Sequence, residues 1–266
     1  MESFVQDEED EMDEDEDDEE EPEDVGENSV LRSCFLQMVD TLSQQAPSSI
    51  SQVRLLVSEL RRITVLWDEL WLGCLSQHQH DVARRLYQLE VEQKKLQENS
   101  TLDELTKVKL MRQKYNIVMK PVVIVLEQLA RLTSVPAETP HEKQFQAAHM
   151  DHIAKALEAL KNPPLAGELK PQQCWQKFKS LHAELLRQSQ KRVFQTLKLP
   201  EISPQLAGMK NSAITMPGLS QPMVTIAGIE NSVSILPTKT RPKKLAMLGS
   251  DGKYYVYLFK GMDISI

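Results

Sequence analysis

The spacing of apolar residues constrains the fold of this chain more than any other feature. From residue 30 to about residue 198, aliphatic and aromatic side chains recur every three or four positions, which is the period of one helix face. Helix-breaking or helix-starting residues divide this stretch at Pro47, Asn99, Pro140 and Pro163. We therefore expect a mainly α fold in which residues 30–198 form a helical bundle.

The longest apolar stripe begins at Ile50 and contains two tryptophans. It continues without a break through Trp67 and Trp71, which predicts a single helix that runs to about Glu98. The two tryptophans are four residues apart and therefore lie on one helix face. They could form a platform for a ligand, but large aromatic side chains at this spacing favour a place in the core.

Capping signals predict where the later helices begin. Thr101 with Glu104, and Thr139 with Glu142, both match the capping box in which a threonine and a glutamate satisfy each other's backbone amides. A last helix is expected after Pro171. Its apolar residues are expected to face inward: Trp175, Phe178, Leu181, Leu185, Leu186 and Val193.

Charge is distributed very unevenly along the chain. Residues 1–29 hold 18 acidic and no basic residues, whereas the remainder holds 21 acidic and 31 basic residues. Carboxylates at this density repel one another, and few apolar groups oppose the repulsion. We expect residues 1–29 to be a disordered acidic tail, which either binds a basic partner or only keeps the chain soluble.

Composition excludes several classes of protein. No apolar run reaches the roughly 18 to 20 residues that span a bilayer, and the acidic start is unlike a signal peptide, so no membrane partner is expected. The three cysteines, Cys34, Cys74 and Cys174, are odd in number and widely spaced. They predict neither a disulfide framework nor a zinc site, and they favour a reducing compartment.

Two groups of polar residues are candidate binding sites, one for a metal ion and one for an anion or a nucleic acid. Four histidines in close pairs lack accompanying ligands, so they are expected to be surface residues rather than metal ligands: His78, His80, His149 and His152. A basic cluster indicates either contact with nucleic acid or a nuclear import receptor, or a solvated loop beside a phosphate site: Lys239, Arg241, Lys243 and Lys244.

The pattern changes after residue 199, where prolines and β-branched residues replace the helical period. Residues 244–248 and 254–260 predict two strands joined by a turn, in other words a β-hairpin. Glycine in such a turn lets backbone amides approach a phosphate, although the same residues also make an ordinary hairpin turn. Without a partner layer, residues 201–266 are expected to be poorly ordered.

Several segments resemble the phosphatidylinositol-3-kinase-related protein kinases. Residues 59–71 are similar to the first helix of the four-helix rapamycin-binding-type (FRB) domain, and residues 136–143 resemble the branch that acts in nonsense-mediated mRNA decay. The later segments resemble the linker before the kinase domain and the start of that domain: residues 201–206, 213–218, 235–245, 249–253 and 257–261. The resemblance covers roughly residues 40–261.

The resemblance implies a domain organisation and an ATP-binding site. It places a helical FAT/FRB-like bundle at residues 30–198, and a linker with a truncated kinase N-lobe at residues 199–266. One set of residues would form the loop that covers the ATP phosphates: Gly249, Ser250, Asp251, Gly252 and Lys253. Lys260 would be the lysine that contacts those phosphates.

The family's catalytic loop and metal ligands have no counterpart in this sequence, so no catalytic residue is expected in this chain. Strong binding of a cofactor by the chain alone is not expected either. The resemblance implies that the full-length parent uses ATP with Mg or Mn to phosphorylate Ser or Thr before Gln. Its implied partners are an RNA-surveillance helicase as substrate and accessory subunits of the kinase complex. Its implied location is the cytoplasm and nucleus, without direct binding of nucleic acid.

A second hypothesis belongs to a different class. The chain could be a non-catalytic helical interaction protein whose bundle binds one partner and whose acidic tail docks on a basic surface. Nucleotide affinity separates the two hypotheses, because only the kinase hypothesis predicts it, once the missing lobe is present.

Overall fold

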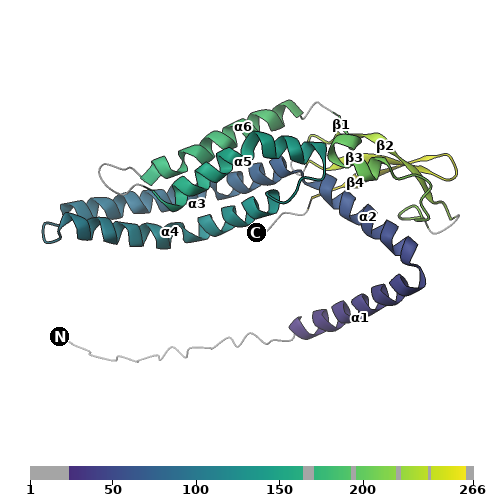
Figure 1. The fold of residues 1–266 in the computed structure, drawn as a ribbon, viewed down its shortest axis with the longest axis horizontal. Coiled ribbons are helices and arrows are strands. Elements are labelled where there is room, and N and C mark those ends of the chain that lie inside the picture. Colours follow the sequence, from purple (N-terminus) through teal and green to yellow (C-terminus); the bar gives the residue numbers. More distant parts are fainter. Residues whose placement is uncertain (1–23, 164–170, 193–195, 220–222, 239–240, 262–266) are drawn as a thin grey trace, which may run out of the picture. The chain divides into compact units, whose positions relative to one another are not determined.

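A computed structural model describes residues 24–163, 171–192, 196–219, 223–238 and 241–261 (Figure 1). As expected, the fold is mainly α, with a short antiparallel sheet near the C-terminal end of the sequence. Most of the predicted acidic tail lies outside the described residues, as do Val193 and Lys239. Among the described residues, no helix combines the length and apolar character needed to cross a membrane.

Residues up to Ile50 form a unit of their own. This unit contains α1 (Asp24–Gln45) and the start of α2 (Pro47–Thr64). Ala46 interrupts the helix between them, at the position the sequence predicts. The first helix begins at Asp24, so it includes the last few residues of the segment that was expected to be a tail.

Four long helices form a bundle: α3 (Trp67–Glu98), α4 (Glu104–Thr133), α5 (Pro140–Lys161) and α6 (Gln176–Arg192). A 3-10 helix, η1 (Pro171–Trp175), leads into α6. Trp71 is fully buried, and its indole donates a hydrogen bond to Thr133 Oγ1 at 3.1 Å. Trp67 packs against the same core, so the core interpretation of the tryptophan pair is confirmed.

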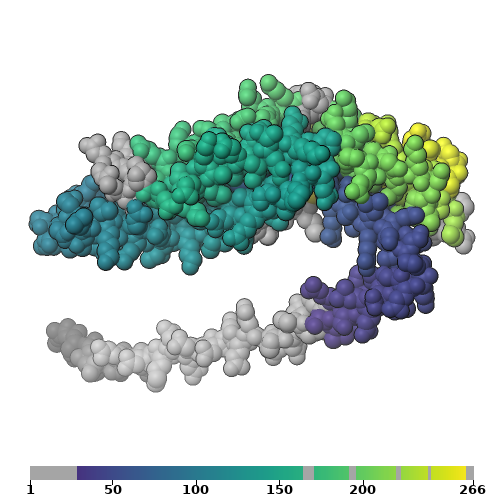
Figure 2. All heavy atoms as spheres, in the orientation of Figure 1, coloured from purple at the N-terminus to yellow at the C-terminus, as the bar shows by residue number. Residues whose placement is uncertain are grey.

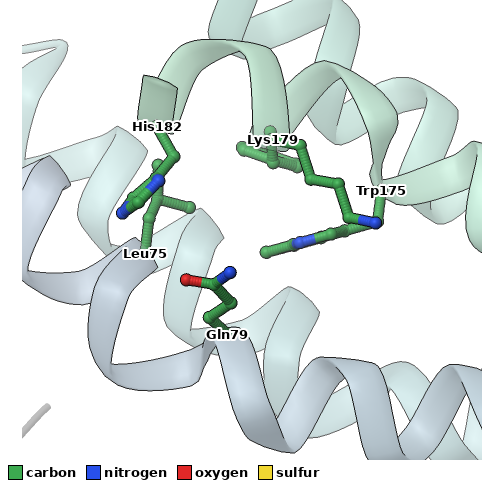
Figure 3. Close-up of a pocket in the computed structure, with 6 residues that line it drawn as sticks. Leu75, Gln79, Trp175, Lys179 and His182 are labelled. Atoms are coloured by element: carbon green, nitrogen blue, oxygen red, sulfur yellow. The ribbon is translucent and has the colours of Figure 1, made fainter. Parts of the chain in front are cut away.

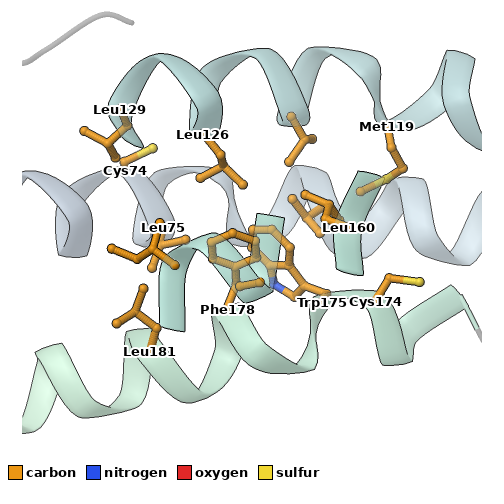
Figure 4. Close-up of a cluster of buried hydrophobic side chains, with 14 of the residues drawn as sticks. Cys74, Leu75, Met119, Leu126, Leu129, Leu160, Cys174, Trp175, Phe178 and Leu181 are labelled. Atoms are coloured by element: carbon orange, nitrogen blue, oxygen red, sulfur yellow. The ribbon is translucent and has the colours of Figure 1, made fainter. Parts of the chain in front are cut away.

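The bundle core draws on all four helices and on η1 (Figure 4). In the space-filling view, the teal and green side chains of α5 and α6 cover this face of the bundle (Figure 2). Phe178, Leu181 and Leu185 are buried as predicted, but Leu186 is 39% exposed. Consecutive helical residues are about 100° apart around the axis, so Leu186 lies at the edge of the buried face when Leu185 points into the core.

One of the two predicted capping boxes is confirmed. Thr139 Oγ1 accepts a hydrogen bond from the Glu142 amide at 3.1 Å, and Glu142 Oε2 accepts one from the Thr139 amide at 3.2 Å. The box predicted at Thr101 is wrong, because the Thr101 hydroxyl donates to Asn99 Oδ1 at 2.6 Å. Asp103 caps α4 instead, accepting a hydrogen bond from the amide of the third helical residue.

The single helix predicted from Ile50 to Glu98 is also wrong. The helix that contains Ile50 is α2, which ends at Thr64, and a separate helix, α3, begins at Trp67. Leu66 has an extended backbone (φ −76°, ψ 157°), and its amide donates to Glu69 Oε2 at 3.0 Å. The side chain of Glu69 thus starts a new helix where the sequence has neither glycine nor proline.

The sheet has four antiparallel strands in the order β1 (Leu197–Lys198), β2 (Ile226–Ile235), β3 (Lys243–Gly249) and β4 (Tyr254–Phe259). The predicted hairpin is confirmed as β3 and β4, with Ala246 opposite Val256. Two short helices follow β1 in the chain, α7 (Leu199–Ile202) and α8 (Pro204–Ala207). The Ser203 hydroxyl between them donates to Glu59 Oε2 of α2 at 2.6 Å.

The sheet does have a partner layer, so the expected lack of one is wrong. Leu56 and Ile63 of α2 share a buried core with α7, α8 and the inner face of the sheet. This core also includes Leu66, Leu245 and Met247. The expected bundle of residues 30–198 therefore divides in two, because the bundle core begins at Trp67 while α2 packs with the sheet. The four-helix bundle is an insertion between α2 and β1.

Candidate functional site

The outer face of the β3–β4 hairpin is apolar and open. Leu245 and Met247 point into the core, while Ala246 on the opposite face is only partly buried. On β4, Val256 and Leu258 are 54% and 60% exposed. A soluble protein rarely leaves neighbouring aliphatic side chains uncovered on a sheet unless they bind something. This outer face is the candidate site.

Lys260 lies on the same face. Side chains alternate along an extended strand, so Lys260 follows Val256 and Leu258 in position, and it is exposed. Its neighbour Gly261 packs tightly, because a Cβ atom there would lie 2.6 Å from Val65 Cγ2. The backbone beyond β4 is thereby fixed against the junction between α2 and α3. An apolar strip with Lys244 beside it and Lys260 at its end suits a ligand with an apolar ring and an anionic group.

The turn between the two strands needs both of its glycines. Gly252 has φ +80°, which favours glycine over other residues. At Gly249 a Cβ atom would lie 2.7 Å from Val224 Cγ1 and 2.8 Å from Tyr255 Cε2. Gly249 therefore allows the turn to approach the segment before β2. These two constraints fix the course of the loop that the sequence singled out.

Four of the five amides of the turn, which spans residues 249–253, already donate hydrogen bonds within the chain. The amide of Gly249 donates to Lys253 O, and that of Gly252 donates to Gly249 O, at 2.8 and 2.9 Å. The Ser250 amide donates to Thr225 O at 2.9 Å, and the Lys253 amide to Asp251 Oδ1 at 3.1 Å. Side chains of the loop are therefore better placed than its backbone to bind an anion.

Three side chains of the loop differ in their ability to bind an anion. Ser250 Oγ accepts a hydrogen bond from the Thr225 amide at 3.0 Å, and its own hydroxyl hydrogen can still be donated. The Lys253 side chain is 77% exposed. Asp251 Oδ2 accepts a hydrogen bond from the Tyr255 hydroxyl at 2.8 Å, which lowers the pKa of that carboxyl. The Asp251 carboxylate is thus held by Tyr255, whose ring belongs to the inner face of the sheet.

The predicted basic cluster does not form one surface. Lys243 is 1% exposed and pairs with Glu69 Oε2 at 2.7 Å. Arg241 donates to the Ser189 hydroxyl of α6. Lys244 alone of the described members lies on the outer face, opposite Leu258. Of the described members, Lys243 is thus removed from the surface and Arg241 contacts α6, while Lys244 stays exposed.

The prediction that the histidines lie on the surface is wrong for His149. Its side chain is buried beside Phe145, with ring centroids 5.1 Å apart. Burial lowers the pKa of its imidazole, so the neutral form is favoured. In the described segments, no group of three or more histidine, cysteine or acidic residues is arranged to hold a metal ion.

A small pocket between α3 and α6 was not anticipated from the sequence (Figure 3). Its volume is about 190 Å³, below the roughly 300 Å³ at which ligand pockets usually begin. Apolar and polar side chains contribute to it: Leu75, Gln79, Trp175, Phe178, Lys179 and His182. His182 is also hydrogen-bonded to the Ser76 hydroxyl, Nε2 to Oγ, at 2.9 Å. The one feature of the sequence that relates to this pocket is the spacing of Trp175, Lys179 and His182, which are four and three residues apart.

Comparisons with known proteins match most of the chain to one group of kinases. No family model matches the chain. It is 46% identical over 239 residues to the serine/threonine-protein kinase SMG1 of Danio rerio, and 32% identical over 235 residues to Smg1 of Drosophila melanogaster. The chain belongs to the phosphatidylinositol-3-kinase-related kinases. A weaker match, 25% identical over 240 residues, is to the serine/threonine-protein kinase TOR of Arabidopsis thaliana.

The matches cover most of this chain and little of its relatives. They include 89% of the chain in the zebrafish comparison and 86% in the fly comparison. The chain spans only 6% and 7% of those two SMG1 kinases. The outer face of the hairpin therefore belongs to a segment that, in phosphatidylinositol-3-kinase-related kinases, is part of a much longer protein.

Proposed function

We propose that this chain supplies one wall of the ATP site of a serine/threonine kinase that acts in nonsense-mediated mRNA decay. The observation that carries the proposal is the exposed apolar strip of Val256 and Leu258, which ends at Lys260. An adenine ring is flat and apolar on its faces, and aliphatic side chains cover such a ring well. The triphosphate then lies towards the lysine.

In this arrangement the chain binds the nucleotide through side chains. The ammonium of Lys260 neutralises phosphate oxygens at its end of the strip. Ser250 and Lys253 lie at the other end of β4, about 23 Å away along the strand, so they contact the phosphates only in a conformation in which the loop folds over the nucleotide. Asp251 Oδ2 accepts the Tyr255 hydroxyl and lies 3.8 Å from Lys253 Nζ, so the charge of this carboxylate is partly used within the loop. ATP supplies the transferred phosphoryl group with Mg or Mn, and residues outside this chain would have to hold the metal and the protein substrate.

The rest of the proposal concerns the full-length parent. The matching SMG1 and TOR proteins are named as serine/threonine-protein kinases, which supports the reaction class. We propose phosphorylation of Ser or Thr before Gln, an RNA-surveillance helicase as substrate, accessory subunits as further partners, and residence in the cytoplasm and nucleus. The bundle is proposed to contribute no direct contact with nucleic acid.

A chimeric kinase tests this proposal. The matching segment of Danio rerio SMG1 is replaced by this chain, and transfer of labelled phosphate from ATP to a Ser-Gln peptide is measured. Lys260→Met is expected to lower kcat/KM for ATP at least 100-fold, because a charge-assisted contact to the phosphates is lost.

The matched control is Lys210→Met, an exposed lysine away from the outer face, which should leave kcat/KM within twofold. Equal activity of the two variants would contradict the proposal. An active chimera that tolerates Lys260→Met would instead favour the interaction-protein hypothesis, in which the hairpin has no role in binding nucleotide.

A further inference from the structure

A buried ion pair joins the sheet to the first turn of the bundle. Lys243 Nζ lies 2.9 and 2.7 Å from the two carboxylate oxygens of Glu69 and donates to Thr64 O at 3.1 Å. The Lys243 side chain is 1% exposed and that of Glu69 is 19% exposed. An ammonium is rarely buried unless its charge is paired, so Glu69 is what allows Lys243 to occupy this position.

The sheet end of the pair lies next to the candidate phosphate-binding lysine. Lys243 is the first residue of β3 and lies opposite Phe259, the last residue of β4. The strand position fixed by the Lys243 ammonium is therefore directly beside Phe259. Lys260 on the outer face is the residue that follows Phe259.

The bundle end of the pair lies in the start of α3. Glu69 Oε2 also accepts the Leu66 amide at 3.0 Å, so one carboxylate both starts the helix and binds the sheet. A second contact acts at the same place, because Gly261 packs against Val65 between α2 and α3. The backbone on either side of Lys260 is therefore held by the α2–α3 junction rather than by the sheet alone.

We propose that Glu69 and Lys243 are positioning residues for Lys260, so that the placement of the phosphate-contacting lysine depends on the docking of the helical bundle. This inference rests on the proposed function for its biological meaning. The mechanical link itself is independent of nucleotide. Loss of the pair is expected to loosen the end of β4 and to leave the loop end of the same strand unchanged.

Amide hydrogen exchange of the whole chain, without nucleotide, tests the link. In Glu69→Gln the side-chain oxygen can still accept the Leu66 amide, but the charge that pairs with Lys243 is gone. Exchange at Phe259, Lys260 and Gly261 is expected to accelerate about tenfold, while residues 254–256 stay within twofold. As a separate variant with Glu69 intact, Lys243→Arg keeps a cation beside the carboxylate, and exchange at residues 259–261 is expected to stay near that of the unmodified chain.

Glu142→Gln is the matched control, since Glu142 is likewise a capping-box glutamate with a cationic partner, Arg62, but does not contact the sheet. The proposal is overturned if this control accelerates exchange at residues 259–261 as much as Glu69→Gln does. It is also overturned if Glu69→Gln changes nothing there, or if Lys243→Arg, with Glu69 intact, accelerates exchange at residues 259–261 as much as Glu69→Gln does.

The activity of the chimeric kinase, compared with the exchange pattern, keeps the two proposals apart. If the exchange pattern follows Glu69 but Lys260→Met leaves the chimeric kinase fully active, then the link stands and the proposed function fails. If Lys260→Met inactivates the chimera and exchange at residues 259–261 ignores Glu69, the positioning role fails alone.

Discussion

Burial assigns different roles to two lysines of the same hairpin. Lys243 is enclosed and its charge is used inside the protein, whereas Lys260 is exposed at the end of an apolar strip. The difference arises from Glu69, which lies across the junction and provides a partner for only one of them. A lysine that pairs internally stabilises the fold, and a lysine left free can bind a ligand.

At the same scale, His149 predicts how stability depends on pH. Its folded-state pKa is lowered below the ordinary value of about 6.5, so the unfolded chain binds a proton more readily. The stabilisation is fully present above pH 6.5 and is lost as pH falls below that value. Urea unfolding between pH 8 and pH 5 should show this loss.

His149→Phe should flatten the pH dependence of unfolding in that range, because phenylalanine fills the site beside Phe145 without titrating. The exposed His80 provides the control, and His80→Gln should retain the wild-type profile. A variant lacking His149 with an unchanged profile would assign the titration to another group.

The role of a residue could be predicted from the sequence only where that role depends on neighbouring residues in the chain. Gly249 and Gly252 predict a turn without any further information, and the structure has the turn at that position. The burial of Lys243 could not be read, because neighbouring lysines and arginines normally indicate a solvated surface. Its partner lies 174 residues earlier in the chain, and only the fold brings the two together.

At the scale of elements, helix starts decide how this chain is divided. Thr139 and Glu142 start α5 with a complete capping box. Glu69 starts α3 after an extended Leu66 and separates a helix of the sheet core from a helix of the bundle core. The apolar stripe continues across that break because both cores need apolar residues there, which is why periodicity alone predicted one helix.

Capping predicts a measurable difference between two threonines. Thr139→Ala removes the acceptor for the Glu142 amide and should lower the free energy of unfolding by about 1 kcal/mol. Thr101→Ala should change it much less, since Asp103 caps α4. Chemical denaturation of both variants makes the comparison, and an equal loss would argue for the capping box that the sequence suggested at Thr101.

The hairpin and the bundle helices were predictable because their signals lie within single segments. The partner layer of the sheet was not, because α2 precedes β2 by more than 160 residues. β1 has only two residues and gives no periodic signal at all. The small pocket between α3 and α6 likewise depends on which helix faces meet, and no local pattern encodes that.

At the scale of the whole molecule, residues 51–266 form one unit with two hydrophobic cores. The three tryptophans all pack in the bundle core, so tryptophan fluorescence reports on the bundle. The core of the sheet contains tyrosines but no tryptophan among its described residues. The two cores can therefore be followed separately.

Leu245→Ala should destabilise the sheet core by about 2–5 kcal/mol, because Leu245 is fully buried there. Hydrogen exchange in β3 should accelerate, while the urea midpoint measured by tryptophan fluorescence should move little. Trp71→Phe, which removes the hydrogen bond to Thr133, should show the reverse pattern. A common shift of both readouts in both variants would mean that the two cores unfold as one.

The insertion of the bundle between α2 and β1 has a consequence for synthesis. A ribosome adds about 5–20 residues per second, and Leu245 is made roughly 180 residues after Ile63, with which it shares a core. The apolar side of α2 therefore stays unburied by β3 for about 10–40 s, while the intervening helices can already assemble. The hairpin that carries the surface we assign to ATP is thus made long after the helix with which its inner face packs.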